Sequence, residues 1–297
     1  MNLIPKTWRH LSVVLFVGVA LGCFIVSCSC VGRYADKLVA ITLRGVLFKP
    51  LVLPHDIRRL RWHLDGKFEV SRGGALLLLS KGQIYNVLSE APLLRKRQGK
   101  LCDFCAFGDG IVAVSDNSLC SIGEGELKPE VQLPESGMSI ASCSTGDRVF
   151  LFKGGQIYVF RAGGSYVKLL HADKPVLAVT GDGERIYFSI WDKILTWTSG
   201  EKEPTIILDS KLNKAIISLA LDPHSGILYF GTGEGIWALA EGEAIMLLSG
   251  VTGDLVFDRT LLFVKDRSQR SILAVQGASP AVKRQWREMR ADADSSL

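Results

Sequence analysis

Four polar residues in the second half of the chain have side chains that could do chemistry. Asp182 and Glu184 lie in a Gly/Asp-rich turn, and Asp222 and His224 lie in the turn Asp222-Pro-His-Ser-Gly226. Carboxylates and an imidazole can move protons, and they can also hold a partner through charge and hydrogen bonds. Each pair follows a short apolar run, so its position in space depends on what these runs form.

Other signatures of catalysis or metal binding are weak in this sequence. No two of the five histidines share a metal-ligand spacing, and no Gly-x-Ser-x-Gly elbow is present. Gly231-Thr-Gly-Glu-Gly235 lies between two apolar runs and lacks the Lys-Ser/Thr of a phosphate loop, which favours a hairpin turn. The sequence therefore identifies no catalytic residue, no cofactor-binding residue and no metal ligand.

The cysteines past the N-terminal segment are Cys102, Cys105, Cys120 and Cys143. Cys102 and Cys105 have opposite parity on one strand, and Cys105 and Cys143 occupy equivalent positions of neighbouring repeats, too far apart for a bridge. We expect buried free thiols that act as small apolar residues. A Cys-x-x-Cys redox or zinc site is disfavoured, because no helix start and no second ligand pair accompany it.

These residues are placed by a repeat in which an apolar run, a tight turn and a second apolar run recur six times. Successive copies start 36, 38, 37, 41 and 34 residues apart, and periods of roughly 20–50 residues are typical of solenoids and propellers. The copies start at Ala75, Ile111, Val149, Ile186, Ile227 and Leu261.

Each copy has the composition of β-strands. Val149-Phe-Leu-Phe152 and Ile227-Leu-Tyr-Phe230 are apolar at every position, which indicates strands buried on both faces. A further run precedes each central copy and another follows it, giving four antiparallel strands per period. The sequence therefore predicts an all-β protein, a six-bladed β-propeller of four-stranded antiparallel blades.

The run from Leu221 to Trp237 resembles the blade consensus of NHL-type and two-component-regulator-type propellers. The motif is structural, so the resemblance implies the fold and little about function. The last copy has no fourth strand of its own. We expect the N-terminal segment Leu38–Leu43 to supply it and to close the ring, because an open ring would expose strand edges.

The N-terminus has the features of an export signal. Lys6 and Arg9 precede an apolar run from Leu11 to Val26, and Ile25-Val-Ser-Cys28 resembles a bacterial lipobox. Three interpretations remain open: a lipoprotein acylated at Cys28, an uncleaved anchor spanning Leu11–Val31, and a plain cleaved signal. All three export the propeller and imply a location in the cell envelope, on the periplasmic or outer-membrane side.

The expected organisation is an export signal or membrane anchor over residues 1–27, a linker over 28–37, the propeller over 38–279 and a charged tail over 280–297. The formal net charge of +5 includes two basic residues of the signal, which is too little for a nucleic-acid-binding protein. The leading functional hypothesis is a membrane-tethered, non-catalytic scaffold that binds an envelope protein, with Asp182, Glu184, Asp222 and His224 as contact residues.

The alternative hypothesis is a lactonase- or hydrolase-like enzyme, or a small-molecule sensor, that uses the central tunnel. The lining of the tunnel distinguishes the two hypotheses. Converging carboxylates, Asn or His would favour an enzyme, whereas apolar residues with Ser and Gly would favour a scaffold.

The lipobox predicts that Cys28 becomes the acylated N-terminal residue of the mature protein. Cys28→Ser should therefore yield an unlipidated protein that the lipoprotein signal peptidase no longer cleaves. Intact-mass measurement of membrane-extracted protein tests this prediction. A mature N-terminus at another residue, or a mass without acyl chains, would reject it.

Overall fold

The computed structural model describes residues 47–52, 66–87, 89, 91–95, 100–161, 164–210, 213–266, 271–276, 278–280, 282–284 and 287. They belong to one compact unit, Gly45–Leu297. The signal, Cys28, the linker and the segment Leu38–Leu43 lie outside the described residues, so the predictions made for them stay predictions.

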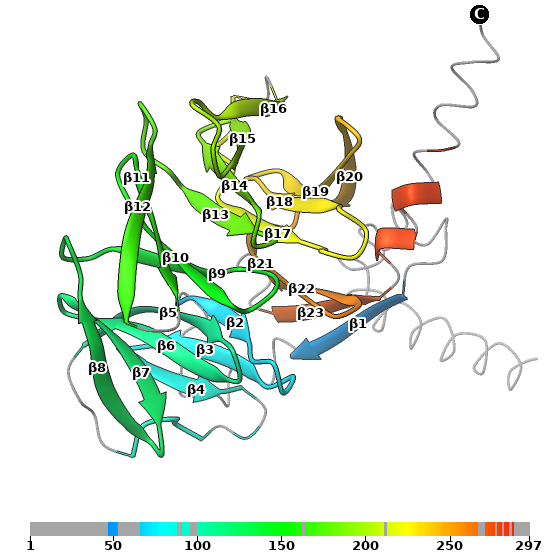
Figure 1. The fold of residues 1–297 in the computed structure, drawn as a ribbon. Coiled ribbons are helices and arrows are strands. Elements are labelled where there is room, and N and C mark those ends of the chain that lie inside the picture. Colours follow the sequence, from blue (N-terminus) through cyan, green and yellow to red (C-terminus); the bar gives the residue numbers. More distant parts are fainter. Residues whose placement is uncertain are drawn as a thin grey trace, which may run out of the picture. The chain divides into compact units, whose positions relative to one another are not determined.

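The unit is a β-propeller of six antiparallel sheets, which we call blades A to F (Figure 1). Blade A comprises β2 (Phe68–Val70), β3 (Leu76–Ser80) and β4 (Gln83–Asn86). Blade B comprises β5 (Leu101–Phe107), β6 (Gly110–Ser115), β7 (Ser118–Gly123) and β8 (Glu126–Gln132). Blade C comprises β9 (Ser139–Ser142), β10 (Arg148–Lys153), β11 (Gln156–Arg161) and β12 (Ser165–His171). Blade D comprises β13 (Ala178–Gly181), β14 (Arg185–Ile190), β15 (Lys193–Thr198) and β16 (Thr205–Asp209). Blade E comprises β17 (Ser218–Leu221), β18 (Leu228–Gly231), β19 (Gly235–Ala240) and β20 (Glu243–Ser249). Blade F comprises β21 (Gly253–Asp258), β22 (Leu261–Asp266), β23 (Ser271–Gln276) and β1 (Leu47–Val52).

The first strand of each blade lies at the centre of the ring. Each of these six inner strands contacts the inner strands of both neighbouring blades, and β2 contacts both β5 and β21. The ring is therefore continuous through its inner strands, and the predicted six-bladed propeller is confirmed.

The second strand of a blade shows why the apolar runs do not alternate with polar residues. In β10, Val149 and Leu151 pack in the core shared with blade B, whereas Phe150 and Phe152 pack in the core shared with blade D. Both faces of the strand are buried because a blade lies on each side. Successive side chains of a strand point to opposite faces, so an unbroken apolar run fills two cores at once.

The hairpin turns between the second and third strands use positive φ angles. Lys81 (φ 51°), Asp116 (φ 52°) and Gly154 (φ 54°) adopt the left-handed conformation that tight hairpin turns require. Gly235 is needed for a different reason, since a Cβ there would come within 2.2 Å of the Leu248 carbonyl oxygen. At the corresponding turn of blade D the positive φ belongs to Trp191, at 55°.

Two blades depart from the regular pattern. Blade A has three strands, and Pro92 forms an isolated bridge to Tyr85 where a fourth strand would lie. In blade F the fourth strand is β1, which pairs antiparallel with β23, with Leu47 opposite Gln276. Cys102, Cys105, Cys120 and Cys143 are all free, as predicted, but the prediction that all four are buried is wrong for Cys102, which is exposed on β5.

Side chains join the blades to one another at all six junctions, because no backbone ladder connects one sheet to the next. In each case a side chain of one blade bonds to the backbone or to a side chain of the following blade near the inner strands. The bonds are Lys67 to Asp103, Asp103 to the Ile140 amide, Ser144 to the Gly181 carbonyl, Ser189 to the Ile216 carbonyl, Ser218 to the Gly253 carbonyl and Lys265 to the Gly66 carbonyl.

Candidate functional site

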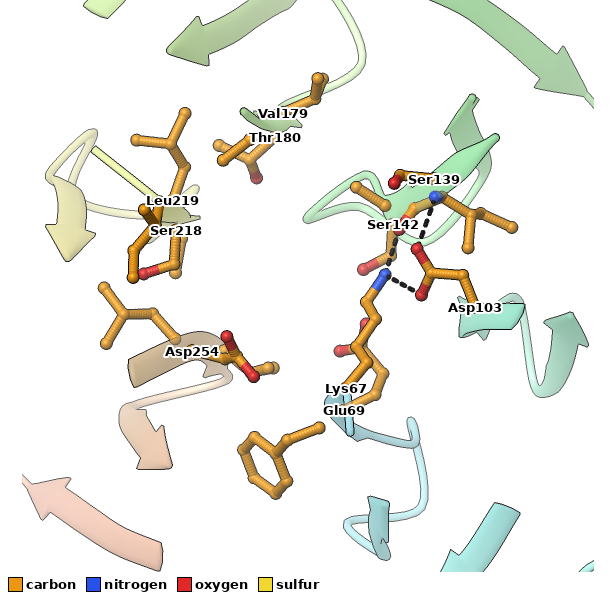
Figure 2. A pocket seen from close by; sticks show the side chains of 18 of the residues that line it. Lys67, Glu69, Asp103, Ser139, Ser142, Val179, Thr180, Ser218, Leu219 and Asp254 are labelled. Atoms are coloured by element: carbon orange, nitrogen blue, oxygen red, sulfur yellow. Dashed lines mark hydrogen bonds and ion pairs between the residues drawn. The ribbon is translucent and has the colours of Figure 1, made fainter. Parts of the chain in front are cut away.

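The inner strands surround a central channel, with a cavity of about 340 Å³ lined by residues of all six blades (Figure 2). Charged side chains of this channel come from blades A, B and F. The lining from blades C, D and E consists of hydroxyl and apolar side chains. The channel therefore has a charged half and a half that carries no ionisable group among its lining residues.

Lys67 and Asp103 form the centre of the charged half. Lys67 immediately precedes β2, and its Nζ lies 3.1 Å from Asp103 Oδ1 on β5 and donates to the Ile140 carbonyl of blade C. Asp103 also accepts hydrogen bonds from the amides of Phe104 (2.8 Å) and Ile140 (3.0 Å). Burial by itself lowers the pKa of Lys67, but the effects of Asp103, Cys105 and Glu69 together outweigh it, and the pKa of Lys67 is raised.

Glu69 is the buried carboxyl group of the channel. It lies on β2, is 5% exposed, and its Oε1 accepts from the Val70 amide at 3.2 Å. Burial raises the pKa of Glu69 to about 7, and the opposing effects of Lys67 and the hydrogen bonds from Val70 and Ser142 do not cancel it. The side chain can therefore take up or release a proton near neutral pH.

The third carboxylate, Asp254 on β21, is paired within the protein. Its Oδ2 lies 2.5 Å from Nζ of Lys265 on β22, a side chain that is completely buried. Lys265 also donates to the Gly66 carbonyl at the entry to blade A. This pair therefore joins blades F and A, as Lys67 and Asp103 join blades A and B.

Across the channel from Lys67 and Asp103 lie Thr180 and Ser218 with Val179 and Leu219, whereas Ser142 lies beside that pair (Figure 2). Ser218 donates to the Gly253 carbonyl at 2.9 Å, so its hydroxyl is engaged between blades E and F. The lining of the channel was expected to distinguish an enzyme from a scaffold. It contains carboxylates, which favour an enzyme, and also apolar residues with serines, which favour a scaffold. Two of its three carboxylates are paired with lysines, which leaves Glu69 as the group best suited to proton transfer.

No metal centre is formed by these carboxylates. Among the described residues, no three His, Cys, Asp or Glu side chains gather closely enough to hold a metal ion. The chemistry that the channel offers is proton transfer at Glu69 and hydrogen bonding from its serine and threonine hydroxyls.

The residues that the sequence singled out lie outside this channel, on the turns between the first and second strands of blades D and E. Asp182 accepts from the amides of Glu184 (3.2 Å) and Arg185 (2.8 Å) and pairs with Arg185 at 3.5 Å. Asp182 therefore shapes its own turn, whereas Glu184 is exposed.

Asp222 has the same structural role in blade E. It accepts from the His224 amide (3.0 Å), from the Ser225 hydroxyl (2.6 Å) and from the Ser279 hydroxyl (2.5 Å). Burial opposes ionisation of this group, but the hydrogen bonds from Ser225 and Ser279 prevail and lower its pKa. His224 is exposed, so each predicted pair contains one residue that holds a turn and one that is accessible.

Lys67, Glu69, Asp103 and Asp254 were not identified as site residues from the sequence. Their signal was a charged residue inside a short apolar run, as in Lys67-Phe-Glu-Val70. The channel could not be recognised from that signal, because these residues are brought together only when the ring closes.

Comparisons with known proteins support the fold. The structure resembles a chain of the nidogen/laminin complex, with a TM-score of 0.55 and 16% identity over 69% of this chain and 90% of that chain. It also resembles the extracellular domain of the one-component system BT4673 from B. thetaiotaomicron, with a TM-score of 0.53 and 10% identity over 77% of this chain and 39% of that chain. No protein-family model matches the sequence, and a search of curated proteins found no match. The two likenesses show a propeller fold and leave the resemblance to NHL-type blades a prediction.

Removal of the Asp103 carboxylate should weaken the junctions between blades A, B and C. Asp103→Ala leaves Lys67 without its ion-pair partner and the Ile140 amide without its acceptor, so we expect the free energy of unfolding to fall by about 2–4 kcal/mol. Asp109→Ala is the control, because Asp109 is fully accessible and lies 3.6 Å from Arg72 on the surface, where a pair contributes at most about 1 kcal/mol. Urea titration followed by circular dichroism measures both, and equal losses would contradict the role given to Asp103.

Glu69 should make stability depend on pH near neutrality. A carboxyl whose pKa rises from 4.5 to about 7 on folding binds more protons in the folded state, so stability falls as pH rises between these values. The effect of this group is at most about 3 kcal/mol. Glu69→Gln should remove that decline, and Glu184→Gln should parallel the wild type when melting is followed from pH 4.5 to pH 8. A parallel decline in Glu69→Gln would show that another group causes it.

Proposed function

We propose that this protein is an exported, membrane-tethered β-propeller that binds a protein of the cell envelope. The tether is the N-terminal apolar segment, with Cys28 as its acylated residue. None of the helices in the described part of the chain has the length and apolar composition needed to cross a membrane. The proposal of a tether is supported by the sequence of residues 1–31 alone.

The observation that best supports protein binding is a group of exposed apolar residues beside the channel. We call Leu177, Trp191 and Ile217 the mouth patch; their exposed fractions are 36%, 52% and 37%. Leu177 and Ile217 immediately precede the inner strands β13 and β17, and Trp191 is in the turn between β14 and β15. All three therefore lie on the face opposite to Asp182, Glu184, Asp222 and His224.

Two backbone hydrogen bonds and one from a serine hydroxyl bring the three residues of the mouth patch together. The Leu177 amide donates to the Ser189 carbonyl at 3.0 Å, and the Ser189 hydroxyl donates to the Ile216 carbonyl at 2.8 Å. The Ile216 amide donates to the Trp191 carbonyl at 2.7 Å. The patch is thus built on a rigid junction of blades D and E, as expected of a preorganised binding surface.

Trp191 is costly for the free protein in two ways. An exposed indole is rare on surfaces without a partner, and a bulky residue at a φ of 55° is strained by roughly 1 kcal/mol or more. Glycine would relieve both costs at this turn. Tryptophan is enriched among residues that dominate protein–protein binding, which favours a role in contact with a partner.

The similar folds are compatible with this proposal. One of them was solved in a complex of nidogen with laminin, and the other is an extracellular domain. A ring of turns on a rigid scaffold suits the same use here.

An enzyme or small-molecule sensor is the second candidate, and Glu69 is the observation that favours it. A carboxyl with a pKa of about 7 inside a channel can act as a general acid or base near neutral pH. Lys67 and Asp103 bond one blade to the next, so their presence in the charged half of the channel does not require a catalytic role. Turnover of a lactone or ester that is abolished by Glu69→Gln would make this candidate the better one.

The mouth patch predicts that partner capture depends on Trp191. Trp191→Gly should preserve or raise the melting temperature, because glycine adopts the required φ without strain, and should weaken capture at least about tenfold. Met246→Ser, which removes an exposed apolar side chain from the outer strand β20, is the control. Crosslinking of the full-length protein in its native envelope, followed by mass spectrometry, measures capture.

A different result would relocate the partner. If capture survives Trp191→Gly and is lost in Glu184→Gln/His224→Gln, the partner binds the turns between the first and second strands instead. If neither variant changes capture, protein binding through either face is wrong.

A further inference from the structure

The structure contains a second cavity, of about 780 Å³, between blades E and F and the C-terminal segment. Its walls are the turn at Asp222, the turn between β21 and β22, and the helical residues 278–280, 282–284 and 287. We call it the basic cavity because four basic residues of the described chain line it: Arg259, Lys283, Arg284 and Arg287.

The C-terminal segment that forms this cavity is held firmly on blade E. Ser279 donates to Asp222 at 2.5 Å and is hydrogen-bonded to the Tyr229 hydroxyl at 2.7 Å. Ala278 and Val282 are buried. The charged residues that follow are therefore positioned by packing of the segment, not by the charges themselves.

The cavity has an excess of positive charge. Among its described lining residues the one carboxylate, Asp222, already accepts hydrogen bonds from Ser225, Ser279 and the turn amides. Within the described ranges, the ion pairs do not include Lys283, Arg284 or Arg287. Cations gathered in this way repel one another, and an anionic ligand would relieve that repulsion.

The strand register places this cavity at the end of blade F where the chain enters the propeller. Leu47, the first residue of β1, lies opposite Gln276, the last residue of β23. Two positions after Gln276 the chain reaches Ala278 and then Ser279 at the basic cavity. The N-terminal segment is therefore joined to the propeller at the same end of the blade.

The length of the connection keeps this end near the proposed tether. Leu47 lies nineteen positions after Cys28 (47 − 28). This stretch spans roughly 65 Å when fully extended and roughly 25 Å on average as a flexible chain. A membrane that holds residues 1–28 would thus keep the basic cavity within reach of its headgroups.

From these observations we infer that the basic cavity binds the phosphate groups of anionic lipids and turns this edge of the propeller toward the membrane. The inference rests on the membrane tether proposed above. The equivalent turns of blades B, C and D carry the exposed acidic residues Asp109, Asp147 and Glu184, which disfavour an anionic surface there. The mouth patch, on the opposite face, then remains open to a protein partner.

The test uses the full-length protein, with its N-terminal segment, in nanodiscs of phosphatidylcholine alone or mixed with phosphatidylglycerol. Amide hydrogen exchange of residues 257–260 and 278–287 should slow at least about fivefold when phosphatidylglycerol is present, since one basic residue near an anionic surface contributes about that factor. High salt should abolish the difference.

The decisive variant is Lys283→Glu/Arg284→Glu/Arg287→Glu, which should lose the slowed exchange. The charge-matched control, Lys128→Glu/Lys168→Glu/Lys202→Glu, reverses exposed residues of blades B, C and D and should keep it. Replacement of the first three residues by Gln provides a milder variant if reversal lowers the melting temperature.

The other possible results each reject either the lipid contact or the tether. Equal exchange in both lipids, with the protein still in the discs, rejects the lipid contact and leaves the tether intact. Equal slowing by inorganic phosphate in phosphatidylcholine discs identifies a soluble phosphate ligand instead. Slowing that requires an added acidic envelope protein assigns the cavity to that protein, and failure of the chain to stay in the discs rejects the tether.

Discussion

The structure depends on the joining of six separate sheets, since no strand of one blade pairs with a strand of the next. A blade is stable only between two neighbours, because each middle strand buries both of its faces in different cores. At the centre of the ring, short polar bonds join neighbouring blades. Serine hydroxyls make three of these junctions, and buried Lys–Asp pairs contribute to the others.

This constraint explains the mixed character of the channel. Polar residues that look like catalytic groups, above all Lys67 and Asp103, satisfy the backbone of the next blade, and replacing them would cost stability whether or not the channel has a ligand. Glu69 differs because its position is unfavourable for the ionised form. Ionised Glu69 lowers the stability of the fold at neutral pH. A contribution to stability therefore does not explain why this carboxyl group lies in the channel.

The two faces of the ring carry different chemistry, although both are made of short turns. On one face, Asp182 and Asp222 stabilise turns, and the C-terminal segment packs against blade E with its basic residues around a cavity. On the other face, Leu177, Trp191 and Ile217 are exposed around a junction of blades D and E. A disc with a basic edge on one side and an apolar patch on the other suits a protein held between a membrane and a partner.

The sequence by itself determined the number of blades, the strand composition and the unpaired state of the four body cysteines, because these follow from local periodicity and from the parity of strands. It also indicated which turns carry Asp182, Glu184, Asp222 and His224, but not that the aspartates bond to their own turns. Residues from different blades meet only after the ring closes: Lys67 meets Asp103 across one junction, and Ser279 meets Asp222 after the chain has passed through another blade. The channel, the mouth patch and the basic cavity were therefore decided by the tertiary structure, since each joins residues that no spacing in the sequence relates.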